Sequence, residues 1–158
     1  MWRARLNFFK MTKVFKSQLV EIVNAGVAGG NTATRIQFQD QPYLRNKAIF
    51  GIEIVTGSDM SGNTSPTGRV IYDLQTASAY LTLYLNDVKN PNNVGEWIQN
   101  VPLPLLHRVQ NQTPDPFVRK AYELAGQVIY WEKCFITLPL PLNNTVDNSF
   151  LFNVYFQN

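Results

Sequence analysis

Hydrophobic and polar side chains alternate with a period of two along most of this sequence. In residues 50–55, for example, Phe50, Ile52 and Ile54 alternate with small, charged or less bulky neighbours. Such alternation is typical of β-strands, in which successive side chains point to opposite faces of a sheet. The pattern predicts about eight strands, at 16–23, 34–39, 50–55, 70–74, 80–85, 96–101, 127–137 and 149–156.

Turn-forming residues separate these segments. Residues 25–31 are rich in glycine, 57–68 form a long polar stretch, and 143–148 are rich in asparagine. Glycine and asparagine favour turns because they tolerate backbone conformations that other residues avoid. Only 116–124 is expected to be helical, because Asp115 is a candidate cap and a proline follows it at the first position.

About eight strands and at most one short helix predict an all-β protein, folded as an antiparallel β-sandwich. The connections at 57–68 and 102–126 are too long for tight hairpins. Long connections favour Greek-key crossings and, at this number of strands, a single jelly roll. The chain of 158 residues, 45% of them hydrophobic, can bury one sizeable core. We expect a basic N-terminal arm at 1–16 and one jelly-roll domain at 17–158.

The last predicted strand is apolar on both faces. One face is expected to lie in the core and carries Phe150, Phe152, Val154 and Phe156. The opposite face carries Leu151 and Tyr155 beside polar residues. Because a half-apolar outer face is unusual unless something covers it, Leu151 and Tyr155 are the candidate subunit interface.

The net charge of +3 is distributed unevenly. Residues 1–16 hold five basic and no acidic side chains, whereas the rest of the chain holds nine basic and 11 acidic ones. A short basic arm on a nearly neutral body is typical of proteins that hold nucleic acid or an anionic lipid surface. The residues expected to contact a polyanion, a membrane or a neighbouring protein are Trp2, Arg3, Arg5, Phe8, Phe9, Lys10, Lys13 and Lys16.

The arm also carries an apolar stripe. Trp2, Leu6 and Phe9 recur at helical spacing, as in helices that lie in a membrane interface. The simpler alternative is that these aromatics pack on the protein's own body or on a neighbouring subunit. Translation could also start at Met11, which would make the first ten residues optional. No secretory signal is expected, because polar residues interrupt the apolar stretch, and the single Cys134 indicates a reducing compartment.

Residue types that build catalytic and metal sites are scarce. His107 is the only histidine and Cys134 the only cysteine, which leaves no zinc site and no multi-histidine metal centre. No nucleophile motif accompanies His107, so a hydrogen-bonded loop position is expected for it, and a core position for Cys134. A stretch from Asp59 resembles a calcium loop only faintly, because its twelfth residue is Val70. No cofactor and no metal are expected.

Carboxylates and aromatics leave other functions open. Glu53 and Glu132 lie in predicted strands, and two carboxylates about 5 to 9 Å apart can hydrolyse a glycoside. Nothing in the sequence brings them together, and exposure or pairing with Arg69 or Lys133 is the simpler interpretation. Aromatic residues such as Trp97 could form a platform for a sugar, although at strand spacing most aromatics are expected in the core.

The chain from about residue 14 to its end resembles single jelly-roll structural proteins of viruses, especially minor or vertex capsid proteins of tailless icosahedral phages. The resemblance is architectural and depends on the basic arm with Arg3, Arg5, Lys10, Lys13 and Lys16, the strand count, the loops rich in Asn, Gln and Pro, and the strand at the end of the chain. Lectins and other binding modules share this architecture. The resemblance implies a homo-oligomer around a symmetry axis, whose arm reaches the genome, an internal membrane or a neighbouring capsid protein.

The sequence therefore favours a non-enzymatic virion building block, made in the host cytoplasm and taking no small-molecule substrate. The 26 Asn and Gln residues, against 25 charged ones, agree with a surface suited to hydrogen-bonded contacts. The alternative is a carbohydrate-binding or adhesion module, for example in a host-recognition fibre, which requires exposed aromatics on one concave face. An enzyme comes third and requires Glu53 or Glu132 in a cleft that faces another carboxylate.

Overall fold

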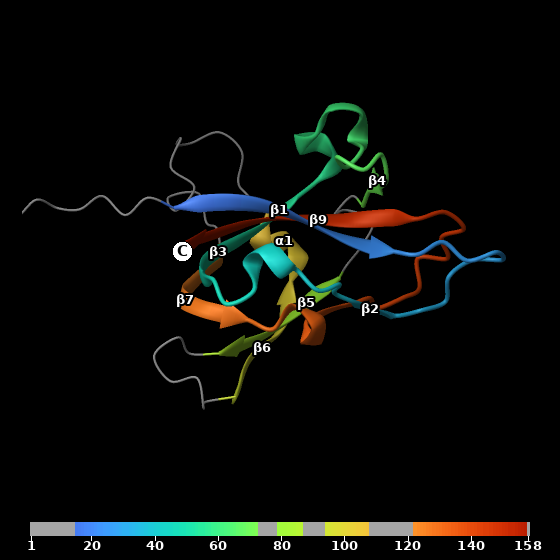
Figure 1. Ribbon diagram of the computed structural model, residues 1–158. Coiled ribbons are helices and arrows are strands. Elements are labelled where there is room, and N and C mark those ends of the chain that lie inside the picture. The colour runs from blue at the N-terminus through green and yellow to red at the C-terminus, as the bar shows by residue number, and fades with distance from the viewer. Residues whose placement is uncertain (1–14, 73–78, 87–93, 108–121, 158) are drawn as a thin grey trace, which may run out of the picture.

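The protein is a curled antiparallel β-sheet whose two halves face each other, as a computed structural model shows (Figure 1). The structure describes residues 15–72, 79–86, 94–107 and 122–157. One half contains β1 (Lys16–Asn24), β9 (Asn148–Gln157), β3 (Ala48–Val55) and β7 (Tyr122–Ile129) in that order. The other half contains β2 (Arg35–Gln37), β8 (Phe135–Thr137), β5 (Tyr80–Asn86) and β6 (Val94–Pro102), with β5 between β8 and β6.

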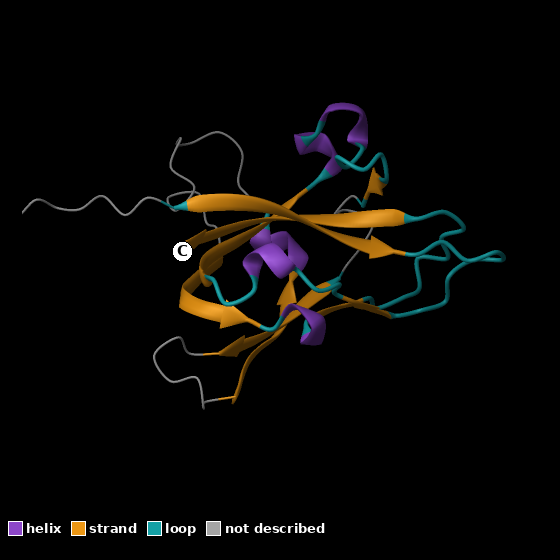
Figure 2. Ribbon diagram, viewed as in Figure 1, coloured by secondary structure: helices purple, strands orange, loops and turns teal. Residues whose placement is uncertain are grey.

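The order of these strands identifies the topology. The chain crosses repeatedly between the two halves, since β1, β3, β7 and β9 lie in one and β2, β5, β6 and β8 in the other, where β5 and β6 follow each other. The end of β7 also pairs with β5 through Leu85 and Ile129, so the halves are joined along one side. A short extra strand, β4 (Val70–Ile71), runs parallel to β9. This is the all-β, Greek-key jelly roll predicted from the sequence, and strands dominate the described residues (Figure 2).

Two details of the prediction are wrong. The single strand expected at 127–137 is two strands, β7 and β8, separated by a 3₁₀ turn, η4 (Trp131–Lys133). Trp131 is buried within this turn, so the apolar pattern continues where the strand stops. The expected helix at 116–124 falls largely outside the described residues, but its last residues, 122–124, belong to β7. The one α-helix that the described residues form is α1 (Leu103–Leu106), which buries both of its terminal leucines.

The core lies between the two halves of the sheet. As predicted, the inner face of β9 is fully buried and supplies Phe150, Phe152, Val154 and Phe156. Phe38 packs against this face, with its ring centroid 5.7 Å from that of Phe152 and 6.2 Å from that of Trp131. The aromatic side chains of β9 and η4 therefore meet in one cluster, which ties the break between β7 and β8 to the central strand.

The outer face of β9 is buried as well, which removes the premise of the predicted subunit interface. Leu151 is 1% exposed and Tyr155 is 8% exposed within a single chain. The excursion 56–72, which contains the 3₁₀ turns η2 (Gly57–Asp59) and η3 (Ser61–Asn63), returns to this half of the sheet and pairs β4 with β9. Burial within one chain explains the apolar side chains, so Leu151 and Tyr155 do not form the exposed patch that a second subunit would contact.

Replacement of Phe152 tests the importance of the central strand. We expect Phe152→Ala to lower the free energy of unfolding by about 3 to 5 kcal/mol, because the ring is fully buried and its removal leaves a cavity. Leu140→Ala, at a side chain that is 76% exposed, is the control and should change it by less than about 0.5 kcal/mol. Urea unfolding followed by tryptophan fluorescence measures both. Equal effects of the two substitutions would contradict this description of the core.

Candidate functional site

The outer face of the β1–β9–β3 sheet carries a row of side chains from three neighbouring strands. Leu19 of β1 lies opposite Asn153 of β9, and Asn153 lies opposite Glu53 of β3. Paired residues in adjacent strands point to the same face, so these three side chains are neighbours although they are far apart in sequence. The next position along the strands places Val55 opposite Leu151 in the same way.

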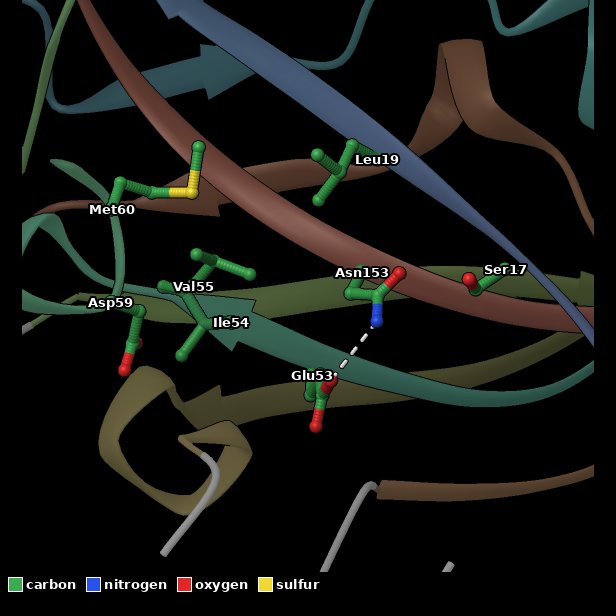
Figure 3. Close-up of a pocket in the computed structure, with 8 residues that line it drawn as sticks. All are labelled: Ser17, Leu19, Glu53, Ile54, Val55, Asp59, Met60 and Asn153. Carbon is green, nitrogen blue, oxygen red and sulfur yellow. Dashed lines mark hydrogen bonds between the residues drawn. The ribbon is translucent and has the colours of Figure 1, made fainter. Parts of the chain in front are cut away.

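A pocket of about 350 Å³ opens on this face (Figure 3). Its floor comes from the three strands, and the turn η2 with the residue after it forms one side. The lining residues are Ser17, Leu19, Glu53, Ile54, Val55, Asp59, Met60 and Asn153. The pocket thus combines apolar walls with two carboxylates, and none of the described residues that line it is cationic.

Glu53 is the most unusual residue of this pocket, because it is a carboxylate that is only 2% exposed. Tyr155 donates a hydrogen bond from its hydroxyl to Glu53 Oε1 at 2.6 Å, and Asn153 donates from Nδ2 to the same oxygen at 3.1 Å. The other oxygen, Oε2, has no hydrogen-bond partner among the described residues. A buried carboxylate oxygen without a donor costs free energy, so this site is built at the expense of stability.

Asp59 lies on the η2 side of the pocket and is held by its own turn. Its Oδ2 accepts hydrogen bonds from the backbone N and from Oγ1 of Thr56, both at 2.9 Å. His107 follows α1, and its Nε2 lies 3.2 Å from the same Oδ2. This contact joins the end of α1 to η2. It agrees with the hydrogen-bonded loop position that the sequence predicts for His107.

This cluster does not have the geometry of a catalytic triad. In such a triad the histidine uses one ring nitrogen for the hydroxyl and the other for the carboxylate. Here Thr56 Oγ1 and Asp59 Oδ2 both lie near Nε2 of His107, at 3.5 and 3.2 Å. The hydroxyl also donates to the carboxylate directly. The arrangement is therefore a structural clasp between a turn and a helix end.

The remaining candidate residues lie elsewhere or outside the described residues. Glu132 is exposed in η4 and does not line the pocket with Glu53. Cys134 is buried as predicted, and burial raises the pKa of its thiol to about 12, which keeps it unreactive. Of the arm residues expected to make contacts, Lys16 is described and is exposed at the first position of β1. The other residues of this group lie outside the described residues; they are Trp2, Arg3, Arg5, Phe8, Phe9, Lys10 and Lys13.

The described residues contain neither an exposed aromatic platform nor a metal cluster. The exposed aromatics among them are Tyr43 and Tyr80, which lie on η1 (Pro42–Leu44) and on β5 respectively, and neither lines the pocket of Glu53. The side chain of Trp97 is not described. No group of three His, Cys, Asp or Glu side chains in the described residues could hold a metal ion. No helix in the described part of the chain is long and apolar enough to cross a membrane.

Besides the pocket, the structure has a pair of ordered loops at one end of the sandwich, 25–34 and 138–147. They extend together beyond the strands (Figure 1). The buried Asn144 connects them: its Oδ1 accepts from Asn24 Nδ2 at 3.0 Å, and its Nδ2 donates to the backbone oxygens of residues 24, 25 and 146. Gly26 allows the close approach, because a Cβ there would lie 2.5 Å from the backbone of Val146. The paired loops present Val27, Leu140 and Val146 as exposed apolar side chains.

Sequence reasoning identified Glu53 as a candidate but missed the pocket. Its position in a strand was correct, and the pocket that it lines also includes a second carboxylate, Asp59, which the sequence analysis did not connect with it. The partners Asn153 and Tyr155 come from a strand about 100 residues later. No local pattern indicates which strand lies beside β3, so no sequence signal could have paired these side chains.

Glu21 of β1 binds the segment 56–72 to the sheet. Its carboxylate accepts hydrogen bonds from the hydroxyls of Ser149, Thr67 and Ser65 at 2.6 to 2.8 Å, and Arg69 Nη1 lies 3.5 Å away. Burial acts to raise the pKa of Glu21, but the three hydroxyls and the arginine together lower it below its usual value of 4.5. The ionised form is therefore favoured in the folded protein.

The pH dependence of unfolding tests this contact. Since the pKa of Glu21 is lower in the folded state, its contribution to stability is complete above about pH 4.5 and is lost as the pH falls through the folded pKa. Glu21→Gln should therefore lower stability at pH 7 and make it less dependent on pH below 4.5. Urea unfolding at several pH values measures this, with the exposed Glu132→Gln as control. An unchanged pH profile in Glu21→Gln would contradict the shift.

Comparisons with known proteins give no family for this chain. No protein-family model matches the sequence, and searches of the curated proteins and of the solved structures found no significant match. The function is therefore inferred from the chain's own fold, charge and pocket.

Proposed function

We propose that this chain is a non-enzymatic structural protein of a virus particle, a capsid or vertex building block. It self-associates, and its basic arm, residues 1–16, contacts neighbouring capsid proteins, the genome or an internal membrane. The observation that carries the proposal is the strand β1, which is an open edge of the jelly roll and is preceded directly by this arm.

The edge of β1 is suited to contact with another molecule. Among the described residues β1 pairs with β9 along its whole length, and its other edge pairs with no strand. Its first four side chains, at 16–19, are all exposed, including Leu19. An unpaired strand edge with exposed side chains offers backbone donors and acceptors to a second chain. The surface therefore provides a directional contact close to the origin of the arm.

Charge and loops also support assembly. The arm carries a charge of +5, while the remaining residues carry a net charge of −2, so an arm and the body of another copy attract each other. The paired loops at the far end of the sandwich add exposed apolar side chains on a framework held by Asn144. Because these loops are already ordered, they lose little conformational entropy on binding. A low entropy cost favours the many repeated contacts of a capsid shell.

The mass in solution tests the proposal. Light scattering behind size exclusion should give a closed oligomer, a small integer multiple of 18.0 kDa, at low salt. The arm is neutralised by Arg3→Gln, Arg5→Gln, Lys10→Gln and Lys13→Gln. This variant should form a smaller oligomer than the wild-type chain at the same protein concentration. The matched control carries the same charge change on the body, at Arg35, Arg45, Lys47 and Lys133.

Two results separate the parts of this proposal. A wild-type chain that stays monomeric at every concentration and salt would contradict self-association. If the wild-type chain assembles and the arm variant assembles equally well, the arm has no part in self-association. Binding of the wild-type chain to DNA or to anionic vesicles, compared with the arm variant, then tests the arm: each lost phosphate contact lowers the slope of log affinity against log salt by about 0.9.

A further inference from the structure

We infer that the pocket of Glu53 is a socket for a guanidinium or ammonium group, and that its occupant is a basic side chain from the N-terminal arm of a second copy of this chain. The inference rests on the proposed function, because it names the contact that self-association would use. It is carried by a buried carboxylate oxygen that has no hydrogen-bond partner in the described part of the chain, in a pocket to whose lining that part contributes no cation.

The carboxylate of Glu53 is prepared for a donor that the described residues do not supply. Tyr155 and Asn153 both donate to Oε1, and Asn153 also donates to the tyrosine hydroxyl at 2.8 Å. These bonds fix the orientation of the carboxylate, while Oε2 points away from Asn153 (Figure 3). Lysine and arginine side chains supply charged donors, and a bond between a charged donor and a carboxylate is stronger than one between neutral groups.

The walls of the pocket suit the rest of such a side chain. Leu19, Val55 and Met60 supply apolar surface around the carboxylates. Lysine and arginine bury their methylene stems on surfaces of this kind while the charged end reaches a polar partner. The volume of about 350 Å³ is sufficient for one long side chain with part of its backbone. Asp59 adds a second negative charge on the η2 side, which favours a cation over a neutral donor.

The N-terminal arm is the segment of this chain that supplies cations without acidic neighbours. Residues 1–13 contain Arg3, Arg5, Lys10 and Lys13 and no acidic residue. The arm joins β1 at the edge of the pocket, since Ser17 lines it. An extended segment of 13 residues spans at most about 45 Å, which is enough to reach a neighbouring copy.

The geometry favours the arm of another copy over the arm of the same chain. The pocket lies beside β1 after the junction, between Ser17 and Leu19, so the chain's own arm would have to reverse direction at once to enter it. The ring of Phe15, at the junction, packs edge-on against Phe50 of β3 with centroids 5.1 Å apart. This contact holds the start of β1 against β3.

A labelled peptide tests the socket directly. The receptor is the full chain with the four arm cations replaced by glutamine, so that its own arms do not occupy the pocket. The probe is a fluorescent peptide of residues 1–16, measured by anisotropy. Glu53→Gln in this receptor should weaken peptide binding about 10- to 100-fold, which corresponds to the loss of one hydrogen bond to a charged group. Glu132→Gln, the same change at an exposed site, should bind as the parent receptor does.

The controls separate the socket from folding and from assembly. Glu53→Gln should unfold at about the temperature of the parent, because the amide oxygen of glutamine can still accept the hydrogen bonds of Tyr155 and Asn153. If it fails to fold, Met60→Lys is the second variant, since an ammonium on the pocket wall should compete with the peptide and weaken its binding at least 10-fold. An N-acetylated peptide in which all five basic residues, Arg3, Arg5, Lys10, Lys13 and Lys16, are glutamine should not bind.

Equal binding by Glu53→Gln and the parent receptor, or equal binding of the glutamine-substituted and wild-type peptides, would overturn the socket. Either result leaves the proposed function standing if the wild-type chain still forms a closed oligomer. Conversely, a monomeric wild-type chain together with peptide binding that depends on Glu53 would overturn the building-block proposal and keep the socket for cationic segments.

Discussion

The structure depends on one strand, β9, which is paired on both edges and buried on both faces. It pairs with β1 over nine positions and with β3 over most of its length, and β4 adds a short parallel contact at its start. Its inner side chains form the centre of the core, whereas Ser149 and Tyr155 on its outer face contact carboxylates of the neighbouring strands. Without β9, strands β1 and β3 would have no common neighbour in the sheet.

Two carboxylates on the outer face of this sheet have opposite roles. Glu21 is surrounded by hydroxyl donors and an arginine, so its charge stabilises the attachment of the excursion 56–72. Glu53 is more deeply buried, yet one of its oxygens has no donor among the described residues. Proteins usually satisfy buried polar groups with hydrogen bonds, so an exception that lines a pocket needs an explanation. The contrast between the two residues directs the functional inference to Glu53.

An edge strand with an arm before it connects the fold to assembly. β1 shares the pocket, ends the sheet on one side and follows the most basic segment of the chain. In the proposed building block these features act together, since the arm of one copy would neutralise the acidic pocket of the next. Head-to-tail contacts of this kind close into rings when the rotation between copies is right.

The sequence by itself determined the strands, the jelly-roll class, the inner face of β9 and the core position of Cys134, because a period of two and turn residues are local signals. Sequence reasoning was wrong where a local signal has two interpretations. The apolar pattern continues through the buried Trp131, so the break between β7 and β8 was not predicted. The apolar Leu151 and Tyr155 suggested a subunit interface, whereas they are buried within the chain. Only the tertiary structure decided that Glu53, Asn153 and Tyr155 meet and that η2 closes a pocket around them. Such a site is made by residues about 100 positions apart, and which strands become neighbours depends on the packing of the whole sheet.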